Sequence, residues 1–211
     1  VSPPGVAREQ LYNNNTIINQ NEQALALRVS GGGLQPKDAR AVFKNVSVDM
    51  RQYNRLKMFL HAESLPDEIV LRDGQMVGFI RFGNDFTQNF YQIEIPLKVT
   101  IPTSLSGSGS DCSPLSPEVV WPAENNIDLD LSLLTKMKIA AMKIDPNTLP
   151  LDGIYYPDDD ILNTGGDGDN NMRLGIKGNP NFGLVRNLMV GVKNAELHQN
   201  VKGEVWFNEL R

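Results

Sequence analysis

Apolar and polar side chains alternate along most of this chain, and this period of two constrains the fold more than any other feature. Successive side chains of a β-strand point to opposite faces of the sheet, so strict alternation indicates a strand with one buried face. The clearest example is residues 89–99, whose apolar face holds Tyr91, Ile93, Ile95, Leu97 and Val99. Pro96 falls on the polar face and cannot donate a ladder hydrogen bond, so we expect an edge or a bulge there.

Other segments repeat this alternation and bring the expected total to about eight strands. They cover residues 24–29, 42–50, 55–63, 77–83, 172–178, 188–194 and 203–211. One segment has a helical period instead, with a single apolar face made of Leu133, Leu134, Met137, Ala140, Ala141 and Ile144. Asp130 is placed to cap its N-terminus, and Pro146 is placed to stop it.

Many short strands and one helix predict a mainly-β fold, a jelly-roll-like antiparallel β-sandwich with one helix and two long loops. The length of 211 residues suits one domain, residues 1–211. The expected surface loops are residues 103–118, rich in Ser, Gly and Pro, and residues 145–172, rich in acids and turn formers. Residues 1–24 form an amide-rich strap, and neutral amides suit a segment that lies against polar backbone.

The charge balance and the hydropathy pattern exclude two classes of partner surface. The net charge is -5, the wrong sign for a surface that binds nucleic acid through counterion release. No stretch reaches the roughly 18 apolar residues of a membrane helix, so we expect no direct membrane span. Val1 is not followed by a secretory signal pattern, which indicates a piece of a longer protein.

The acidic loop is the candidate metal site. Asp158, Asp160, Asp167 and Asp169 offer hard oxygen ligands, and the glycines among them allow the backbone to wrap around a calcium ion. The spacing fits no complete EF-hand, because the bidentate Glu at the twelfth position is missing. A solvated acidic loop without metal is the alternative, and we expect no other cofactor. The single cysteine, Cys112, lies beside Asp111, which favours an unreactive thiol.

The residue pattern shows no catalytic signature, and we expect that the chain is not an enzyme. The only histidines are His61 and His198, and no nucleophile signature precedes a helix. A structural histidine is the simpler interpretation of His61. No catalytic residue is assigned.

A mixed aromatic and polar set on the predicted strands is the candidate ligand-binding face. Aromatic rings stack on sugars or anchor another chain, and polar neighbours orient the ligand. The set consists of Phe59, His61, Phe79, Arg81 and Trp206. Each residue is also compatible with ordinary packing, so the set predicts a site only if the fold brings its members together.

Several long blocks resemble the SprA/Sov family, the giant outer-membrane proteins of the type IX secretion system of Bacteroidetes, which are associated with gliding motility. The blocks are residues 3–25, 40–63, 79–99, 121–138, 178–194 and 203–211. The resemblance implies a structural or interaction domain of the outer-membrane translocon that supports protein export and gliding motility. A carbohydrate-binding, lectin-like surface module is the alternative function.

The same resemblance implies partners and a location. The expected partners are a PorV-type barrel protein, a plug protein, secreted cargo and the remainder of the chain's own barrel. The implied location is an extramembrane portion at the outer membrane. Long excursions of outer-membrane barrels are extracellular, which favours the cell surface over the periplasm.

Overall fold

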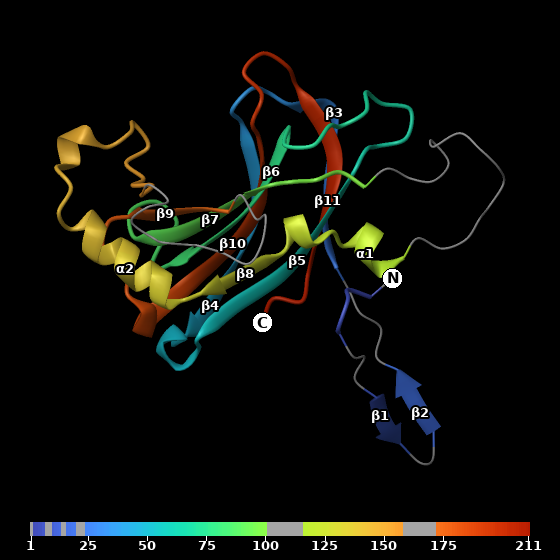
Figure 1. Cartoon of the computed structure of the whole chain (residues 1–211), viewed down its shortest axis with the longest axis horizontal. Helices are drawn as coiled ribbons and strands as arrows, with labels where there is room; N and C mark the ends of the chain where they lie inside the picture. The colour runs from blue at the N-terminus through green and yellow to red at the C-terminus, as the bar shows by residue number, and fades with distance from the viewer. Residues whose placement is uncertain (1, 7–9, 14–15, 20–23, 101–115, 158–171) are drawn as a thin grey trace.

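Two antiparallel sheets lie face to face in the computed structural model, which describes residues 2–6, 10–13, 16–19, 24–100, 116–157 and 172–211 (Figure 1). The larger sheet contains, in spatial order, β4 (Ala39–Val48), β10 (Val185–Asn194), β6 (Met76–Gly83), β7 (Phe90–Pro96) and β9 (Arg173–Lys177). The smaller sheet contains β3 (Leu25–Leu34), β11 (Val201–Asn208), β5 (Arg55–Glu63) and β8 (Ile127–Asp130). The predicted β-sandwich is confirmed.

The pairing of the strands follows the winding of a jelly roll. Strand β3 pairs with β11, β4 with β10, β5 with β8, and β6 with β7, as in one long hairpin folded back on itself. The pairs β10–β6 and β11–β5 then roll this hairpin into two sheets. Strand β9 is an addition on the outer side of β7. This winding leaves β3 and β4 as the edges on one side of the sandwich.

The inward faces of the two sheets form one core, as the alternation predicts. Tyr91, Ile93 and Ile95 of β7 are fully buried, together with Leu60 of β5 and Ile80 of β6. Val205 and Phe207 of β11 close the core from the smaller sheet. Each of these strands therefore gains stability from the apolar surface that it removes from water.

Pro96 lies at a local edge of the sheet, although β7 as a whole is not an edge strand. Strand β7 lies between β6 and β9, but its pairing with β9 ends at Glu94. Pro96 is the last residue of β7 and pairs only with Val77 of β6. The missing N–H is tolerated because β9 does not extend to this position.

The predicted helix is present, shortened at both ends. Helix α2 (Ser132–Ala141) buries Leu134 and Met137 completely, and the Oδ1 atom of Asp130 accepts a hydrogen bond from the N–H of Ser132 at 2.8 Å. The residues before it, up to the predicted cap Asp130, pair with β5 as strand β8, which the alternation did not predict. A second helix, α1 (Pro117–Val120), is a single turn, so the expectation of one helix is corrected.

Short elements complete the described chain. Four 3₁₀ turns are η1 (Met50–Gln52), η3 (Ala123–Asn125), η4 (Pro146–Thr148) and η5 (Phe182–Leu184). In the strap, β1 (Gln10–Asn13) and β2 (Thr16–Asn19) pair as a hairpin that projects from the sandwich (Figure 1). The described part of residues 145–172 is not wholly superficial, because Ile154 is buried and Tyr155 bridges to Ile176.

Candidate binding surfaces

The structure divides the five predicted ligand-binding residues between the two outer faces of the sandwich. Phe59, His61 and Trp206 lie on the outer face of the smaller sheet, where Trp206 is directly opposite His61 in the register of β5 and β11. Phe79 and Arg81 lie on the outer face of the larger sheet, opposite Glu94 and Gln92 respectively. The five residues therefore do not form one site, and ligand binding by either group stays a prediction.

The group on the smaller sheet is a packed aromatic cluster around a buried histidine. The ring centroids of His61 and Trp206 are 4.4 Å apart, and Trp121 lies 5.9 Å from the His61 ring. The Nδ1 atom of His61 lies 2.7 Å from the carbonyl oxygen of Val120, and its Nε2 atom lies 3.3 Å from a carboxylate oxygen of Glu63. Since His61 and Trp121 are only 2% and 3% exposed, this cluster mainly fixes α1 against the sheet.

The group on the larger sheet belongs to a buried polar network. The guanidinium Nε of Arg81 donates to Gln92 at 2.7 Å, and the amide of Gln92 donates to Glu94 at 2.6 Å. The hydroxyl of Tyr156 donates to the same Glu94 carboxylate at 3.1 Å, and Lys193 lies 3.5 Å from it. Burial lowers the pKa of Arg81, and burial next to Glu94 raises the pKa of Tyr156. Every member has a partner, so the network holds residues 154–156 on the sheet.

The predicted calcium ligands Asp158, Asp160, Asp167 and Asp169 lie outside the described residues, as does Cys112. Among the residues that the structure does describe, no group of three or more His, Cys, Asp or Glu side chains could hold a metal ion. Calcium binding by the acidic loop stays a prediction. Within the same described part of the chain, no helix is long and apolar enough to cross a membrane.

Sequence reasoning did not identify one accessible surface that follows β4, and we call it the edge groove. It consists of three adjoining hollows. Those of about 390 and 420 Å³ lie between the edge strands β3 and β4, and that of about 300 Å³ lies between the end of β4, η1, the start of β5 and the C-terminal residues. The first two hollows share Val42, and the last two share Leu188 and Leu210, so the groove is continuous. Its floor is the inward face of the neighbouring strands, including Val190, Val192 and Phe207.

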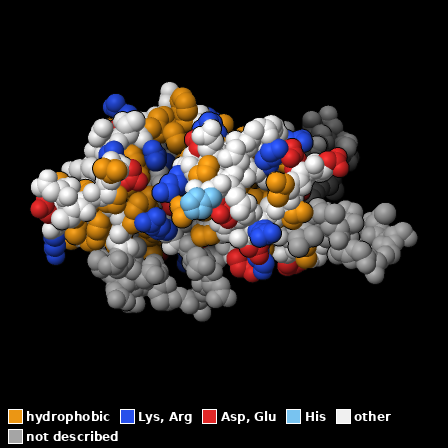
Figure 2. All heavy atoms as spheres, turned by 90° about the horizontal axis from the view of Figure 1, so that it is seen from above, with side chains coloured by type: hydrophobic (Ala, Val, Ile, Leu, Met, Phe, Trp, Pro, Cys, Tyr) orange, Lys and Arg blue, Asp and Glu red, His pale blue; other side chains and the backbone are white. Residues whose placement is uncertain are grey.

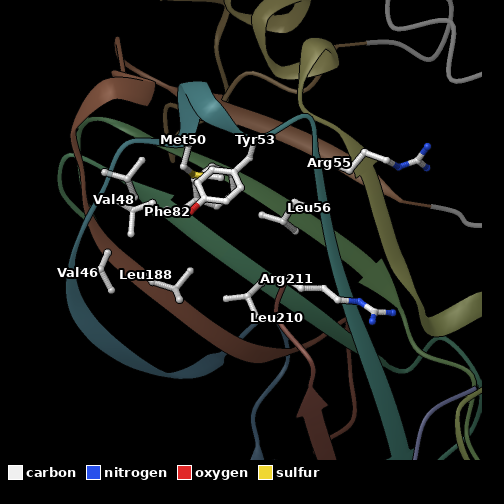
Figure 3. A pocket seen from close by; sticks show the side chains of 11 residues that line it. Val46, Val48, Met50, Tyr53, Arg55, Leu56, Phe82, Leu188, Leu210 and Arg211 are labelled. Atoms are coloured by element: carbon white, nitrogen blue, oxygen red, sulfur yellow. The ribbon is translucent and has the colours of Figure 1, made fainter. Parts of the chain in front are cut away.

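The rims of the edge groove leave large apolar side chains in contact with solvent. Leu25 is 45% exposed, Val42 40% and Val48 38%, although all three lie on strands that border the core. Figure 3 shows the end of the groove nearest η1, where Val46, Val48, Met50, Leu188 and Leu210 surround the space and Arg55 and Arg211 extend to one side. The two hollows toward the open end are mainly apolar and the one nearest the turn is more polar, and exposed apolar surface of this kind marks an interaction site more often than a free surface.

The two ends of the edge groove differ. At one end, the turn Gln35–Asp38 connects β3 to β4, and the buried amide of Asn194 donates to the carbonyl oxygens of Leu34 at 2.9 Å and Gln199 at 2.7 Å. From this fixed end the two strands diverge into different sheets. The groove is therefore closed at the turn and open toward Leu25 and Val48.

The charged residues that line the edge groove are mostly basic, against the acidic balance of the whole chain. They are Arg28, Arg40, Lys44, Arg55 and Arg211, with Glu209 as the acid among them. Figure 2 shows one face of the molecule on which Lys and Arg side chains gather in the middle among apolar patches. The net charge of -5 therefore does not describe every surface.

Together, the winding and the groove define a jelly-roll β-sandwich module with an apolar and basic edge that no described strand pairs with. The chain belongs to the SprA_N family, described as motility related/secretion protein, and the profile of this family matches residues 1–211. The resemblance noted in the sequence is thereby confirmed, and with it a role related to motility and secretion. No curated protein matches the chain.

Proposed function

We propose that this chain is an interaction domain of the outer-membrane translocon of the type IX secretion system, where it supports protein export and gliding motility. The observation that carries the proposal is the edge groove, a continuous apolar surface on a domain of a motility- and secretion-related family. No element among the described residues covers this surface. Its role is then to hold another polypeptide in the secretion apparatus.

The proposed location is an extramembrane portion of the translocon, at the cell surface rather than in the periplasm. The proposed partners are the remainder of the chain's own barrel, a PorV-type barrel protein, a plug protein and secreted cargo. Support comes from the family resemblance and from the long excursions that outer-membrane barrels carry on their extracellular side. Labelling of intact cells with an antibody against this chain tests the location, since only a surface-exposed domain binds antibody before the cells are opened.

The proposed activity is binding without catalysis and without a cofactor. Both ring nitrogens of the buried His61 contact groups within the fold, which supports a structural role for this residue. The polar network around Glu94 is likewise satisfied internally. The groove combines apolar side chains with basic ones, and this combination suits recognition of a polypeptide. Arg28, Arg40 and Arg55 already contact carboxylates within the fold, whereas Lys44 forms no ion pair with a described residue.

Substitution of the groove in the full-length protein tests the proposed function. Val42→Asp combined with Val46→Asp places two carboxylates in the groove, and we expect loss of cargo export and of gliding at an unchanged protein level. Ile69→Asp is the matched control, because Ile69 is 85% exposed and does not line the groove. Normal export and gliding by the double variant, present at the wild-type level in the outer membrane, would contradict the proposal.

A lectin-like carbohydrate-binding module is the second candidate function. The observation in its favour is the jelly-roll winding together with the half-buried ring of Trp206 beside His61. Reproducible binding of a surface polysaccharide in calorimetric titration, lost in Trp206→Ala without unfolding, would favour this alternative. Unchanged binding in that variant would remove the aromatic cluster as the sugar site.

A further inference from the structure

We propose that the edge groove accepts an extended segment of another polypeptide as an additional β-strand along β4, and that the inward face of this segment alternates acidic and apolar side chains. The occupant is thus a donor strand with the pattern acid–x–apolar–x–acid. The inference rests on the proposed function, because it specifies the chemistry of the partner that the interaction domain would hold.

The first observation concerns the backbone hydrogen bonds of β4. Strand β4 pairs with β10 on one side, and no described strand pairs with it on the other. An edge strand of ten residues presents a row of free N–H and C=O groups, which templates the addition of a strand. Strand β3 is the poorer template, because Gly31 and Gly33 have positive φ angles and its pairing with β11 shifts register beside them.

The register of β4 against β10 shows which side chains an added strand would meet. Arg40, Val42 and Lys44 lie directly opposite Val192, Val190 and Leu188, three residues of the core-facing side of β10. Arg40 and Lys44 therefore sit on the groove-facing side of the strand, on either side of Val42. Directly opposite residues in neighbouring strands lie about 5 Å apart on one face, so an added strand places its inward side chains beside these three.

The positions of Arg40, Val42 and Lys44 determine which side chains the added strand should carry on its inward face. An apolar residue beside Val42 covers the junction of two hollows, because Val42 lines both. The residues two positions before and after it come to lie beside Arg40 and Lys44, where a carboxylate forms a cross-strand ion pair. Lys44 is exposed and forms no ion pair with any described residue, whereas Arg40 already contacts Asp38 at 2.6 Å. Lys44 is thus the more discriminating of the two cations.

The same cations disfavour a second copy of this chain as the occupant. Pairing of two β4 strands would bring Arg40 and Lys44 of one copy near the same cations of the other, and like charges on paired strands are destabilising. The strand β3 carries only Arg28 and would not compensate them. Basic residues on this edge therefore disfavour self-association while leaving the edge open to an acidic strand.

Titration of the 211-residue chain with designed peptides tests this inference. The probe is a nine-residue peptide, capped at both ends, with Thr at odd positions and Glu, Val, Glu and Leu at the four even positions. One control peptide replaces both Glu with Lys, and a second carries proline at its centre. We expect calorimetry to show binding of the Glu peptide only, and hydrogen exchange to show new protection of amides in β4.

A charge reversal in the protein distinguishes charge-specific addition of a strand along β4 from non-specific peptide binding. Lys44→Glu should weaken the Glu peptide about five-fold and abolish its preference over the Lys peptide, since one of the two cross-strand pairs changes sign while that with Arg40 does not. Lys136→Glu is the matched control, because Lys136 is an exposed lysine of helix α2 that does not line the groove, and it should leave both affinities unchanged. Equal binding of the Glu and Lys peptides, or no binding of either, would overturn the inference.

The outcome distinguishes the inference from the proposed function. If the Val42→Asp and Val46→Asp double variant loses export but the wild-type chain binds no peptide, the proposed interaction domain stands and the donor-strand inference is overturned. Peptide binding with normal export in that double variant would retain the donor-strand mode and overturn the secretion role. A concentration-dependent dimer in sedimentation that is abolished by Val42→Asp would identify a second copy as the occupant and overturn the inference.

Discussion

The edge strands on the two sides of the sandwich differ in how far other elements cover them. On the side of β8 and β9, helix α2 packs across both edges and buries Leu134 and Met137 completely, so the core ends under a helix. On the side of β3 and β4, the described residues provide no such cover, and Leu25, Val42 and Val48 are each more than one third exposed. Figure 1 shows α2 beside β8 and β9. One edge is thus covered by a helix, and no described element covers the other, which is the proposed binding surface.

This difference carries a physical lesson about where stability and function reside. The covered side contributes apolar burial to folding, since each buried Leu or Met stabilises the domain by about 1.5–3 kcal/mol. The open side leaves apolar surface in contact with water. A partner that covers this surface would therefore gain hydrophobic free energy on binding. The domain can hold such a surface only because the rest of its core is continuous.

The covered side should be the most sensitive to substitution. Leu134→Asp places a carboxylate where the wild-type side chain is 0% exposed, and we expect a loss of more than about 4 kcal/mol of unfolding free energy. Thr135→Asp is the control on the exposed face of the same helix. Thermal unfolding followed by circular dichroism measures both. A folded Leu134→Asp variant with a near-normal melting temperature would show that α2 does not complete the core.

The closed end of the edge groove should come next in sensitivity. Asn194→Ala leaves the carbonyl oxygens of Leu34 and Gln199 without the amide that binds them, and we expect a loss of about 2–3 kcal/mol. For a domain of this size the melting temperature should fall by about 5–10 °C. Asn200→Ala is the control, because its amide also donates to a carbonyl, that of Gly32, but at the surface. Equal shifts in the two variants would show that Asn194 has no special role at the turn.

A smaller effect is expected in the β6–β7 loop, which supports the outer side of β4 through the contact between Phe86 and Phe43 at 5.0 Å. Asp85 accepts hydrogen bonds from the N–H groups of Thr87, Gln88 and Asn89. Burial of Asp85 acts to raise its pKa, but these hydrogen bonds outweigh it and lower the pKa below the ordinary 3.8. Asp85→Ala should therefore cost about 1–2 kcal/mol at neutral pH.

The pH dependence of this effect follows from the sign of the shift. Because the pKa of Asp85 is lower in the folded state, the carboxylate stabilises the fold above pH 3.8, and this contribution is lost as the pH falls below 3.8 toward the depressed value. Urea unfolding of wild type and Asp85→Ala should give curves that converge over this acidic range. A constant difference from neutral pH to pH 2 would contradict the assignment.

The sequence predicted the sheets better than it predicted their edges. Period-two alternation located the strand segments from β3 to β11, apart from β8, because each has an inward face that must be apolar. Strand β8 was missed because its four residues are too few to show a clear alternation. Alternation is a local property, and it does not report which strand lies at an edge.

The candidate site was largely outside the reach of sequence reasoning for the same reason. The proposed aromatic set split between two faces, because the alternation does not say which sheet a strand joins. Gln92 and Glu94 lie on the polar face of the predicted strand 89–99, but both are buried, and Tyr156, distant in sequence, forms hydrogen bonds with them. The edge groove depends on long-range pairing, although one signal was present: β4 combines valines on one face with Phe43 on the other and carries only basic charges.

The smallest effect is expected at the open edge, and it tests the comparison most directly. Val42→Asp should change the unfolding free energy of the isolated chain by no more than about 1 kcal/mol, because Val42 is already 40% exposed and its new carboxylate stays in water. Val192→Asp is the matched control on the neighbouring strand β10, where the side chain is 0% exposed and an unpaired charge should unfold the domain. Denaturant unfolding of both variants measures the contrast. If Val42→Asp were as destabilising as Val192→Asp, the β3–β4 side would belong to the core of the isolated chain, and the edge groove would have no capacity left for a partner.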